Sequence, residues 1–174
     1  MYVLKKEFLL FAFSFCFIFS HAQILKKIPI SNSGCSIYTY CDFTFETEYS
    51  EDSSLVYVSE CVKEEINYGV ICVKLVKPAS DLVKAEESLV SYLDYLKTSF
   101  KIIRSSGYGR GHRLADNENT RGILDYWEDG EKNKWKIKAW ANGKFIGVVY
   151  GYSTKELPES KLNVFLDGFR FPGR

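Results

Sequence analysis

The side chains that could support nucleophilic chemistry in this 174-residue chain centre on His112, because the other histidine lies in an N-terminal segment that we expect to be removed. A Ser-His-Asp or Cys-His site would need this imidazole as its general base. Ser105, Ser106, Arg113 and Asp116 lie near it in sequence, but the chain has no Gly-x-Ser-x-Gly turn to present a nucleophile. A hydrolase using His112 is therefore the least favoured function, and no catalytic residue is predicted.

A second candidate is the glycine-rich run over residues 107–111, Gly-Tyr-Gly-Arg-Gly. Phosphate loops work because successive amides point at the anion from a strand-to-helix turn. This run instead follows a predicted helix and enters a predicted strand, and it lacks the full dinucleotide fingerprint. A flexible hairpin or a bulged edge strand explains it better, and the sequence predicts no cofactor.

Four cysteines follow the N-terminal segment: Cys35, Cys41, Cys61 and Cys72. In an exported chain an even number indicates two disulfide bonds, with free structural thiols as the alternative. A hairpin turn at 65–68 would place Cys61 opposite Cys72, which favours that bond and leaves Cys35 with Cys41. In an extended strand those last two would lie ~20 Å apart, so their bond requires a bent chain. The spacings lack the paired-cysteine pattern of zinc sites, and no metal is predicted.

Alternating lysines on one predicted strand give the sequence its candidate binding surface. Lys134, Lys136 and Lys138 share a parity that Trp140 continues, so these side chains should lie on one face. Such a surface can bind an acidic glycan, a lipid headgroup or an acidic partner. The alternatives are a solvated strand face or lysines that discourage edge pairing. The candidate binding residues are Lys134, Lys136, Lys138, Trp140, Tyr150 and Arg121.

Aromatic residues of the second half could extend this surface into a platform for a sugar or a protein. Their default role is core packing, since aromatic side chains are enriched in strands. They are Tyr108, Tyr126, Trp127, Trp140, Tyr150 and Tyr152.

Residues 1–22 predict a secretory signal peptide. Lys5 and Lys6 precede a short apolar stretch, and residues 20–22 end it with small residues at the first and third positions. The apolar stretch is about 12 residues, shorter than the ~20 that a transmembrane helix needs. We expect cleavage before Gln23 and an exported protein, periplasmic or secreted, without a transmembrane segment. The alternatives are lipidation at Cys16 and a retained anchor.

The net charge limits the classes of partner that we expect, and the chain length limits the number of domains. Without the predicted signal peptide, basic and acidic residues are equal in number, and a neutral chain does not favour nucleic-acid binding. Residues 23–174 are long enough for a single α+β domain with its own core.

Hydrophobic periodicity predicts an α+β protein with the element order βββ-α-ββββ-α. Residues 23–34 read as a loose lead-in. Period-two alternation predicts strands over 36–49, 55–62, 68–76, 105–114 (broken by glycines), 122–128, 134–141 and 144–152. Apolar residues at three- and four-residue steps predict a long helix over 82–100, capped by Ser80 or Asp81. Pro158 begins a short helix that Gly168 ends. Because hairpins join most strands, we expect one antiparallel sheet of about six or seven strands flanked by both helices.

This element order, with the closing segment 165–171 (FLDGFRF), resembles the PsbP-like fold. That group includes photosystem II extrinsic subunits, a Ran-binding nuclear import factor and many exported bacterial proteins of unknown function. The resemblance covers most of the chain after residue 22 and is one of topology, so no functional residue is transferred. It implies a docking or accessory role more often than catalysis. The Ala22-Gln23 junction is also similar to those of exported Bacteroidetes proteins.

Three functions remain open from the sequence. The leading hypothesis is an exported, non-catalytic protein that binds a partner protein or envelope component through an aromatic and basic sheet face. The alternative is a small-molecule or glycan-binding module using the same aromatic residues, and the third is the hydrolase. Strand register decides whether the candidate residues form one patch, because a one-residue shift moves a side chain to the other face.

Overall fold

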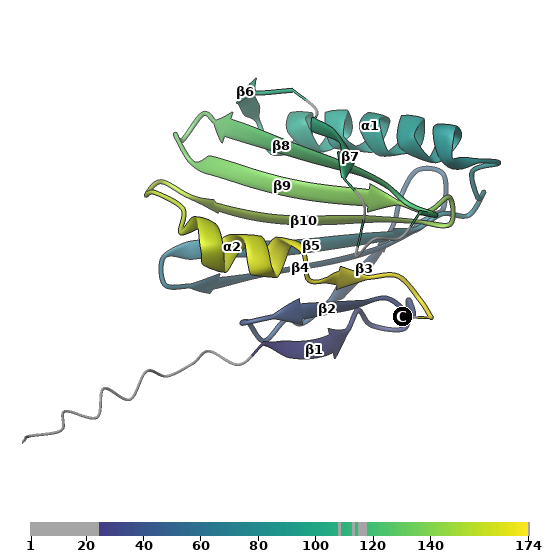
Figure 1. The fold of residues 1–174 in the computed structure, drawn as a ribbon, viewed down its shortest axis with the longest axis horizontal. Coiled ribbons are helices and arrows are strands. Elements are labelled where there is room, and N and C mark those ends of the chain that lie inside the picture. Colours follow the sequence, from purple (N-terminus) through teal and green to yellow (C-terminus); the bar gives the residue numbers. More distant parts are fainter. Residues whose placement is uncertain (1–24, 108, 113, 115–117, 174) are drawn as a thin grey trace, which may run out of the picture.

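The computed structural model describes residues 25–107, 109–112, 114 and 118–173. The predicted signal peptide, Tyr108, Arg113 and Asp116 lie outside these residues. Figure 1 shows the fold. The described residues form eleven strands and two helices. The elements are β1 (Lys26–Pro29), β2 (Ser36–Thr39), β3 (Glu46–Tyr49), β4 (Leu55–Lys63), β5 (Ile66–Lys74), α1 (Leu82–Ser99), β6 (Ile102–Ser105), β7 (Gly109–His112), β8 (Arg121–Asp129), β9 (Lys134–Ala141), β10 (Phe145–Ser153), α2 (Glu159–Leu166) and β11 (Phe169–Arg170).

An eight-stranded sheet in the order β3-β4-β5-β10-β9-β8-β6 forms the centre of the protein, and β7 also pairs with β8. Its neighbouring strands are antiparallel throughout. The remaining strands form a separate three-stranded sheet in the order β1-β2-β11. The predicted α+β class and antiparallel pairing are confirmed, while the large sheet has eight strands where six or seven were expected.

The two helices pack on opposite faces of the large sheet, so each face has its own hydrophobic core (Figure 1). The division follows the strand period: on β10, Val148 belongs to one core and its neighbour Val149 to the other. Helix α1 buries Ala85, Leu89, Leu93 and Leu96 in the core that contains Val148, which we call the first core. Helix α2 buries Leu162, Phe165 and Leu166 in the core that contains Val149, which we call the second core and to which the small sheet also contributes.

Local signals explain where the helices begin and how the chain ends. The Asp81 carboxylate accepts a hydrogen bond of 2.9 Å from the Lys84 amide, which identifies Asp81 as the N-cap of α1. Pro158 occupies the N-cap position of α2. After α2, Phe169 and Phe171 are buried, so the aromatic tail packs back onto the body as the sequence predicts. No helix in the described part of the chain is long and apolar enough to cross a membrane.

The N-terminal part differs from the sequence prediction in two ways. The expected strand 36–49 is two strands in different sheets, β2 and β3. The Cys41 amide donates to the Thr39 hydroxyl at 2.9 Å, and this side-chain bond bends the chain directly after β2. The expected lead-in contains β1, which pairs with β2. Three of its four residues are exposed, so β1 shows no apolar alternation in the sequence.

One disulfide bond joins Cys41 to Cys61, whereas Cys35 and Cys72 are buried free thiols. The favoured pairing of Cys61 with Cys72, and of Cys35 with Cys41, is therefore wrong. The bend after β2 turns Cys41 away from the strand and lets it reach β4.

The hairpin between β4 and β5 explains the error. It turns at Glu64 and Glu65, which have φ values of 52° and 62°, and Lys63 pairs directly with Ile66. The turn is thus two residues long and lies closer to β4 than expected. This register places Tyr68, rather than Cys72, opposite Cys61.

Candidate functional site

Three of the predicted binding residues lie on the face of the large sheet that α2 covers. The Lys136 ammonium is ion-paired with Glu159 of α2, and Lys138 contacts the Asp167 carboxylate at 2.6 Å. Trp140 stacks on Phe169 with ring centroids 6.4 Å apart. Lys136 is 4% exposed and Trp140 1%. The shared parity is confirmed, but α2 and β11 cover this part of the strand.

Two other predicted residues, Tyr150 and Arg121, lie on the opposite face with α1. Tyr150 pairs with Ile137 and packs in the α1 core. Its hydroxyl donates to the Glu60 carboxylate, and burial, followed by this carboxylate, raises the pKa of Tyr150. Arg121 pairs with Ala141 and approaches Glu86 of α1 at 3.9 Å. The structure therefore does not gather the six candidates into one patch, and their role in binding stays a prediction.

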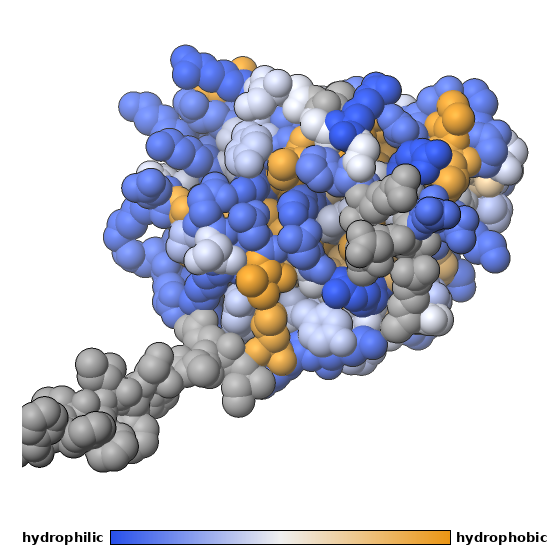
Figure 2. Space-filling view, viewed as in Figure 1, coloured by the Kyte–Doolittle hydropathy of each residue, from blue (hydrophilic) through white to orange (hydrophobic). Residues whose placement is uncertain are grey.

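A groove of about 530 Å³ opens at the end of the large sheet, beside the start of α2. Tyr126 is its most prominent aromatic residue, with 43% of its surface exposed. Of the predicted binding residues, only Lys134 lines it. The face shown in Figure 2 is mainly hydrophilic, with hydrophobic residues exposed in small separate areas. The lining residues are Arg104, Ser105, Ser106, Tyr126, Trp127, Glu128, Lys134, Trp135, Glu156, Leu157 and Glu159.

Charges of both signs surround the Tyr126 ring. The buried ammonium of Lys136 lies 5.2 Å from the ring centroid, an arrangement in which a cation is attracted to the ring face. Burial alone would lower the pKa of Lys136, but hydrogen bonds to Glu159 and Tyr126 outweigh it and raise the pKa. Arg104 approaches Glu128 at 3.6 Å along the rim. The groove thus offers one flat aromatic surface between cations and carboxylates.

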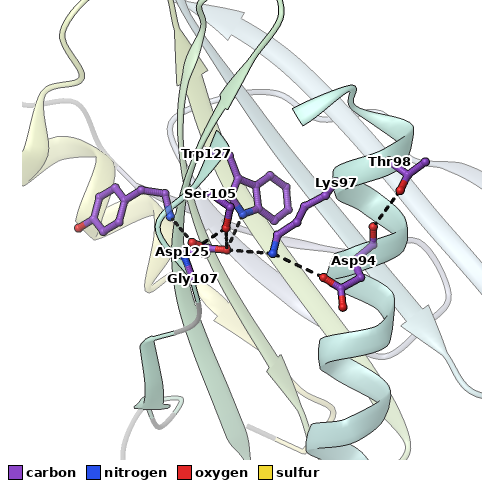
Figure 3. Close-up of polar contacts among 8 residues, drawn as sticks. Asp94, Lys97, Thr98, Ser105, Gly107, Asp125 and Trp127 are labelled. Atoms are coloured by element: carbon purple, nitrogen blue, oxygen red, sulfur yellow. Dashed lines mark hydrogen bonds and ion pairs between the residues drawn. The ribbon is translucent and has the colours of Figure 1, made fainter. Parts of the chain in front are cut away.

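A buried carboxylate holds the strands behind the groove in place (Figure 3). Asp125 is 0% exposed, and its Oδ2 accepts hydrogen bonds from Ser105 Oγ at 2.9 Å and Trp127 Nε1 at 2.6 Å. The Lys97 ammonium of α1 lies 3.4 Å from the same oxygen. The Tyr126 amide donates to Oδ1 at 2.8 Å. One carboxylate therefore ties together β6, β8 and α1.

This cluster is suited to holding structure rather than to activating a nucleophile. Ser105 Oγ donates its proton to a carboxylate that accepts two further hydrogen bonds, and it accepts one from the Gly107 amide at 3.2 Å. A serine nucleophile needs a base that takes its proton during attack, whereas this carboxylate is occupied by hydrogen bonds and by the Lys97 ammonium. What the cluster does is fix the position of Ser105, and hence of the groove wall.

The imidazole of His112 is far from this serine. Ser105 pairs with Trp127 at one end of β8, while His112 pairs with Gly122 near the other end. These positions are five residues apart along β8, which corresponds to ~17 Å. The described residues therefore give a hydrolase built from His112 and Ser105 no geometric support.

The last three residues of the glycine-rich run, 109–111, lie in the short edge strand β7. Its register against β8 shifts between Arg110 and His112, and Gly111 has a φ of 90°. This is the bulged edge strand expected from the sequence, and it does not precede a helix as a phosphate loop would.

Sequence reasoning missed Arg104, Asp125 and the acidic residues of the groove. Arg104 lies on a short strand whose residues are mostly exposed, and Asp125 occupies an inward position of β8 that apolar alternation would assign to a hydrophobic residue. A carboxylate at such a position, two residues from a tryptophan with a donor N–H, is the one local signal that could have identified the cluster.

Comparisons with known proteins identify no family for this chain. A scan against protein-family models found no match, and a search of curated proteins found none. The similarity to the PsbP-like fold stays a prediction. Within the described residues, no group of three or more histidine, cysteine, aspartate or glutamate side chains is placed to hold a metal ion.

Proposed function

We propose that this protein is an exported, non-catalytic binding protein whose site is the groove around Tyr126, and that the groove takes an extended segment of a partner protein. The observation that carries the proposal is the exposed Tyr126 ring between charges of opposite sign at the end of the large sheet. Tyrosine is among the residues that contribute most to protein interfaces, because its ring is flat and rigid and its hydroxyl is polar.

The charges of the groove favour a peptide over a simple anion or cation. Arg104 and Lys134 face a ligand together with Glu128, Glu156 and Glu159. A polypeptide carries both charged side chains and neutral backbone dipoles, so it can satisfy both signs at once.

Strand β6, at the edge of the sheet beside the groove, supports binding of an extended peptide. β6 ends the strand order of the large sheet, and its last residue, Ser105, lines the groove together with Ser106, which follows it. An edge strand has unpaired backbone groups to which an extended peptide can add as a further strand. Side-chain pockets such as the groove then provide specificity for alternate residues of that peptide.

Export of the protein is consistent with a role in binding a partner outside the cytoplasm. The Cys41–Cys61 bond is of the kind that persists in oxidising compartments. Together with the predicted signal peptide, it supports a periplasmic or secreted protein that meets its partner there.

The test is a selection of displayed random peptides against the purified protein, followed by affinity measurement of enriched peptides. The proposal predicts that Tyr126→Ala weakens binding of these peptides at least tenfold, which is about 1.4 kcal/mol. Tyr95→Ala is the matched control, because Tyr95 is 62% exposed on α1 and does not line the groove. Absence of enriched peptides, or equal loss in both variants, would contradict the proposal.

The second candidate is a glycan-binding module, favoured by the same exposed ring, since aromatic faces stack on sugars. It predicts that members of a glycan panel raise the melting temperature of the protein and of the Tyr95→Ala variant but not of Tyr126→Ala. A peptide selection without hits together with such a shift would replace the partner protein with a glycan.

A further inference from the structure

The two cysteines outside the observed disulfide lie in the same part of the second core. Cys35 is 1% exposed and Cys72 is 0% exposed, and both belong to the hydrophobic cluster beneath the small sheet. Their thiols are within hydrogen-bonding reach of each other. Sulfur atoms at such a separation need little movement to bond, provided the backbones are also close.

The backbone around Cys35 is held firmly in this position. Residues 30–35 form a tight loop in which the Ile30 amide donates to the Cys35 carbonyl at 2.9 Å. Within it, Ser33 Oγ donates to the Ile30 carbonyl at 2.7 Å and accepts from the Cys35 amide at 3.0 Å. The thiol is therefore presented by a rigid loop rather than by a mobile end of the chain.

A contact between the sheets brings this loop to Cys72. The Tyr57 hydroxyl of β4 donates to Asn32 Oδ1 in the loop at 2.9 Å. Tyr57 is the direct partner of Cys72 across β4 and β5. The side chains of such partners lie on the same face of the sheet, so the loop that Tyr57 anchors lies over the position of Cys72.

We propose that Cys35 and Cys72 form a second disulfide bond in the exported protein. The inference stands on the burial of both thiols in one cluster and on the loop that Tyr57 anchors beside Cys72, and it is independent of the groove and its ligand. The bond would join the segment before β2 to β5, as Cys41–Cys61 joins the segment after β2 to β4. Strand β2 would then be attached covalently to the β4–β5 hairpin at both ends.

The bond forms by exchange with an organic disulfide, such as that of an exported thiol oxidant. The thiolate of one cysteine attacks the oxidant, and the resulting mixed disulfide is attacked by the second cysteine. The two thiols of the protein lose two protons and two electrons, and the oxidant leaves as two thiols. Because both cysteines are buried, this exchange takes place during folding, before the loop of residues 30–35 closes over β5.

The two thiols differ in how readily they ionise. Hydrogen bonds from Cys72 and then, against the effect of burial, from Ser33 lower the pKa of Cys35. The hydrogen bond to Cys35, and then burial, raise the pKa of Cys72. In the folded arrangement the thiolate therefore forms more readily on Cys35 than on Cys72.

The test is a digest of the exported protein without reductant, after blocking free thiols in denaturant. The expected result is a linked pair of peptides carrying Cys35 and Cys72, beside the Cys41–Cys61 pair. Recovery of Cys35 and Cys72 as separate blocked peptides, or as links to Cys41 or Cys61, would overturn the proposal.

A second measurement uses the variant Cys41→Ser/Cys61→Ser, which lacks the observed bond. If the second bond exists, reductant lowers the melting temperature of this variant. The matched control is Cys35→Ala/Cys72→Ala, in which only Cys41–Cys61 responds to reductant. An unchanged melting temperature in the first variant would contradict the proposal, and if that variant does not fold, the digest of the unmodified protein still decides.

Discussion

Lys136 of β9 is ion-paired with Glu159 at the start of α2, and the two side chains differ sharply in exposure: 5% for the lysine and 63% for the glutamate. The cation is buried because α2 lies across its face of the sheet, and its charge is balanced from the solvent side. This pair therefore attaches α2 to the sheet next to the groove.

Glu159→Gln should lower the free energy of unfolding by about 1–3 kcal/mol, because it leaves a buried ammonium without its counter-charge. Lys136→Met should cost less than this, since a buried ion pair is often replaced by apolar atoms at little cost. Urea denaturation measures both values.

Lys155→Ala is the matched control for this pair. Lys155 and Glu65 are ion-paired with exposures of 64% and 70%, and exposed pairs contribute ~0–1 kcal/mol. If Lys155→Ala lowers the free energy of unfolding as much as Glu159→Gln does, burial of the lysine is not the reason for the contribution of the Lys136–Glu159 pair.

Asp125→Asn should destabilise the protein by about 3 kcal/mol. The change removes a buried charge that faces Lys97 at 3.4 Å, and the amide nitrogen cannot accept the hydrogen bonds made at whichever oxygen position it takes, those of Ser105 and Trp127 or that of the Tyr126 amide. Chemical denaturation monitored by tryptophan fluorescence reports both the stability and the environment of Trp127. Asp94→Asn is the control, because Asp94 also contacts Lys97 but its side chain is 61% exposed; equal effects of the two variants would refute the structural role of Asp125.

Patterns local to one element predicted much of this fold. The helix expected over 82–100 is α1 at Leu82–Ser99, and the strand expected over 134–141 is β9 with the same bounds. Both depend on periodicity and nearby caps, which the sequence displays directly. The common face of Lys136 and Lys138 follows from the same period.

Contacts between distant segments were beyond the reach of these patterns. Parity alone could not reveal that α2 returns to cover Lys136, because that depends on how the chain packs after β10. The disulfide prediction failed on the hairpin turn: Glu64 and Glu65 adopt positive φ without the Asn-Gly or Asp-Gly signal of such turns. The groove joins residues of β6, β8 and β9 with the start of α2, and no single stretch of sequence contains it.

Acid should unfold the protein partly through Asp129. Burial of this carboxylate would raise its pKa, but hydrogen bonds from Asn133, Trp135 and the backbone amides of residues 131 and 133 outweigh burial and lower the pKa. A carboxyl group whose pKa is lower in the folded state stabilises the protein above its unfolded pKa, about 3.9. This contribution is lost as the pH falls from there through the folded pKa.

Stability measured between pH 7 and pH 2 should therefore fall less steeply for Asp129→Asn than for the unmodified protein, although the variant starts lower at pH 7. Asp42→Asn, whose side chain is 91% exposed, serves as the control and should leave the slope unchanged. A slope for Asp129→Asn equal to that of the unmodified protein would show that other groups govern the acid response.

Gly69→Ala should destabilise the protein by about 3 kcal/mol because the Tyr150 ring lies directly on this glycine. A methyl group added to Gly69 would approach the ring carbon Cζ to within 2.1 Å, and Tyr150 is fixed by its hydrogen bond to Glu60. Gly130→Ala is the matched control, since a methyl group there meets no atom within 4 Å. In the Tyr150→Ala background the cost of Gly69→Ala should largely disappear, because the two changes act on one contact. Thermal or urea denaturation of the four proteins of this cycle gives the coupling, and a cost for Gly69→Ala that is the same in both backgrounds would exclude the tyrosine ring as its cause.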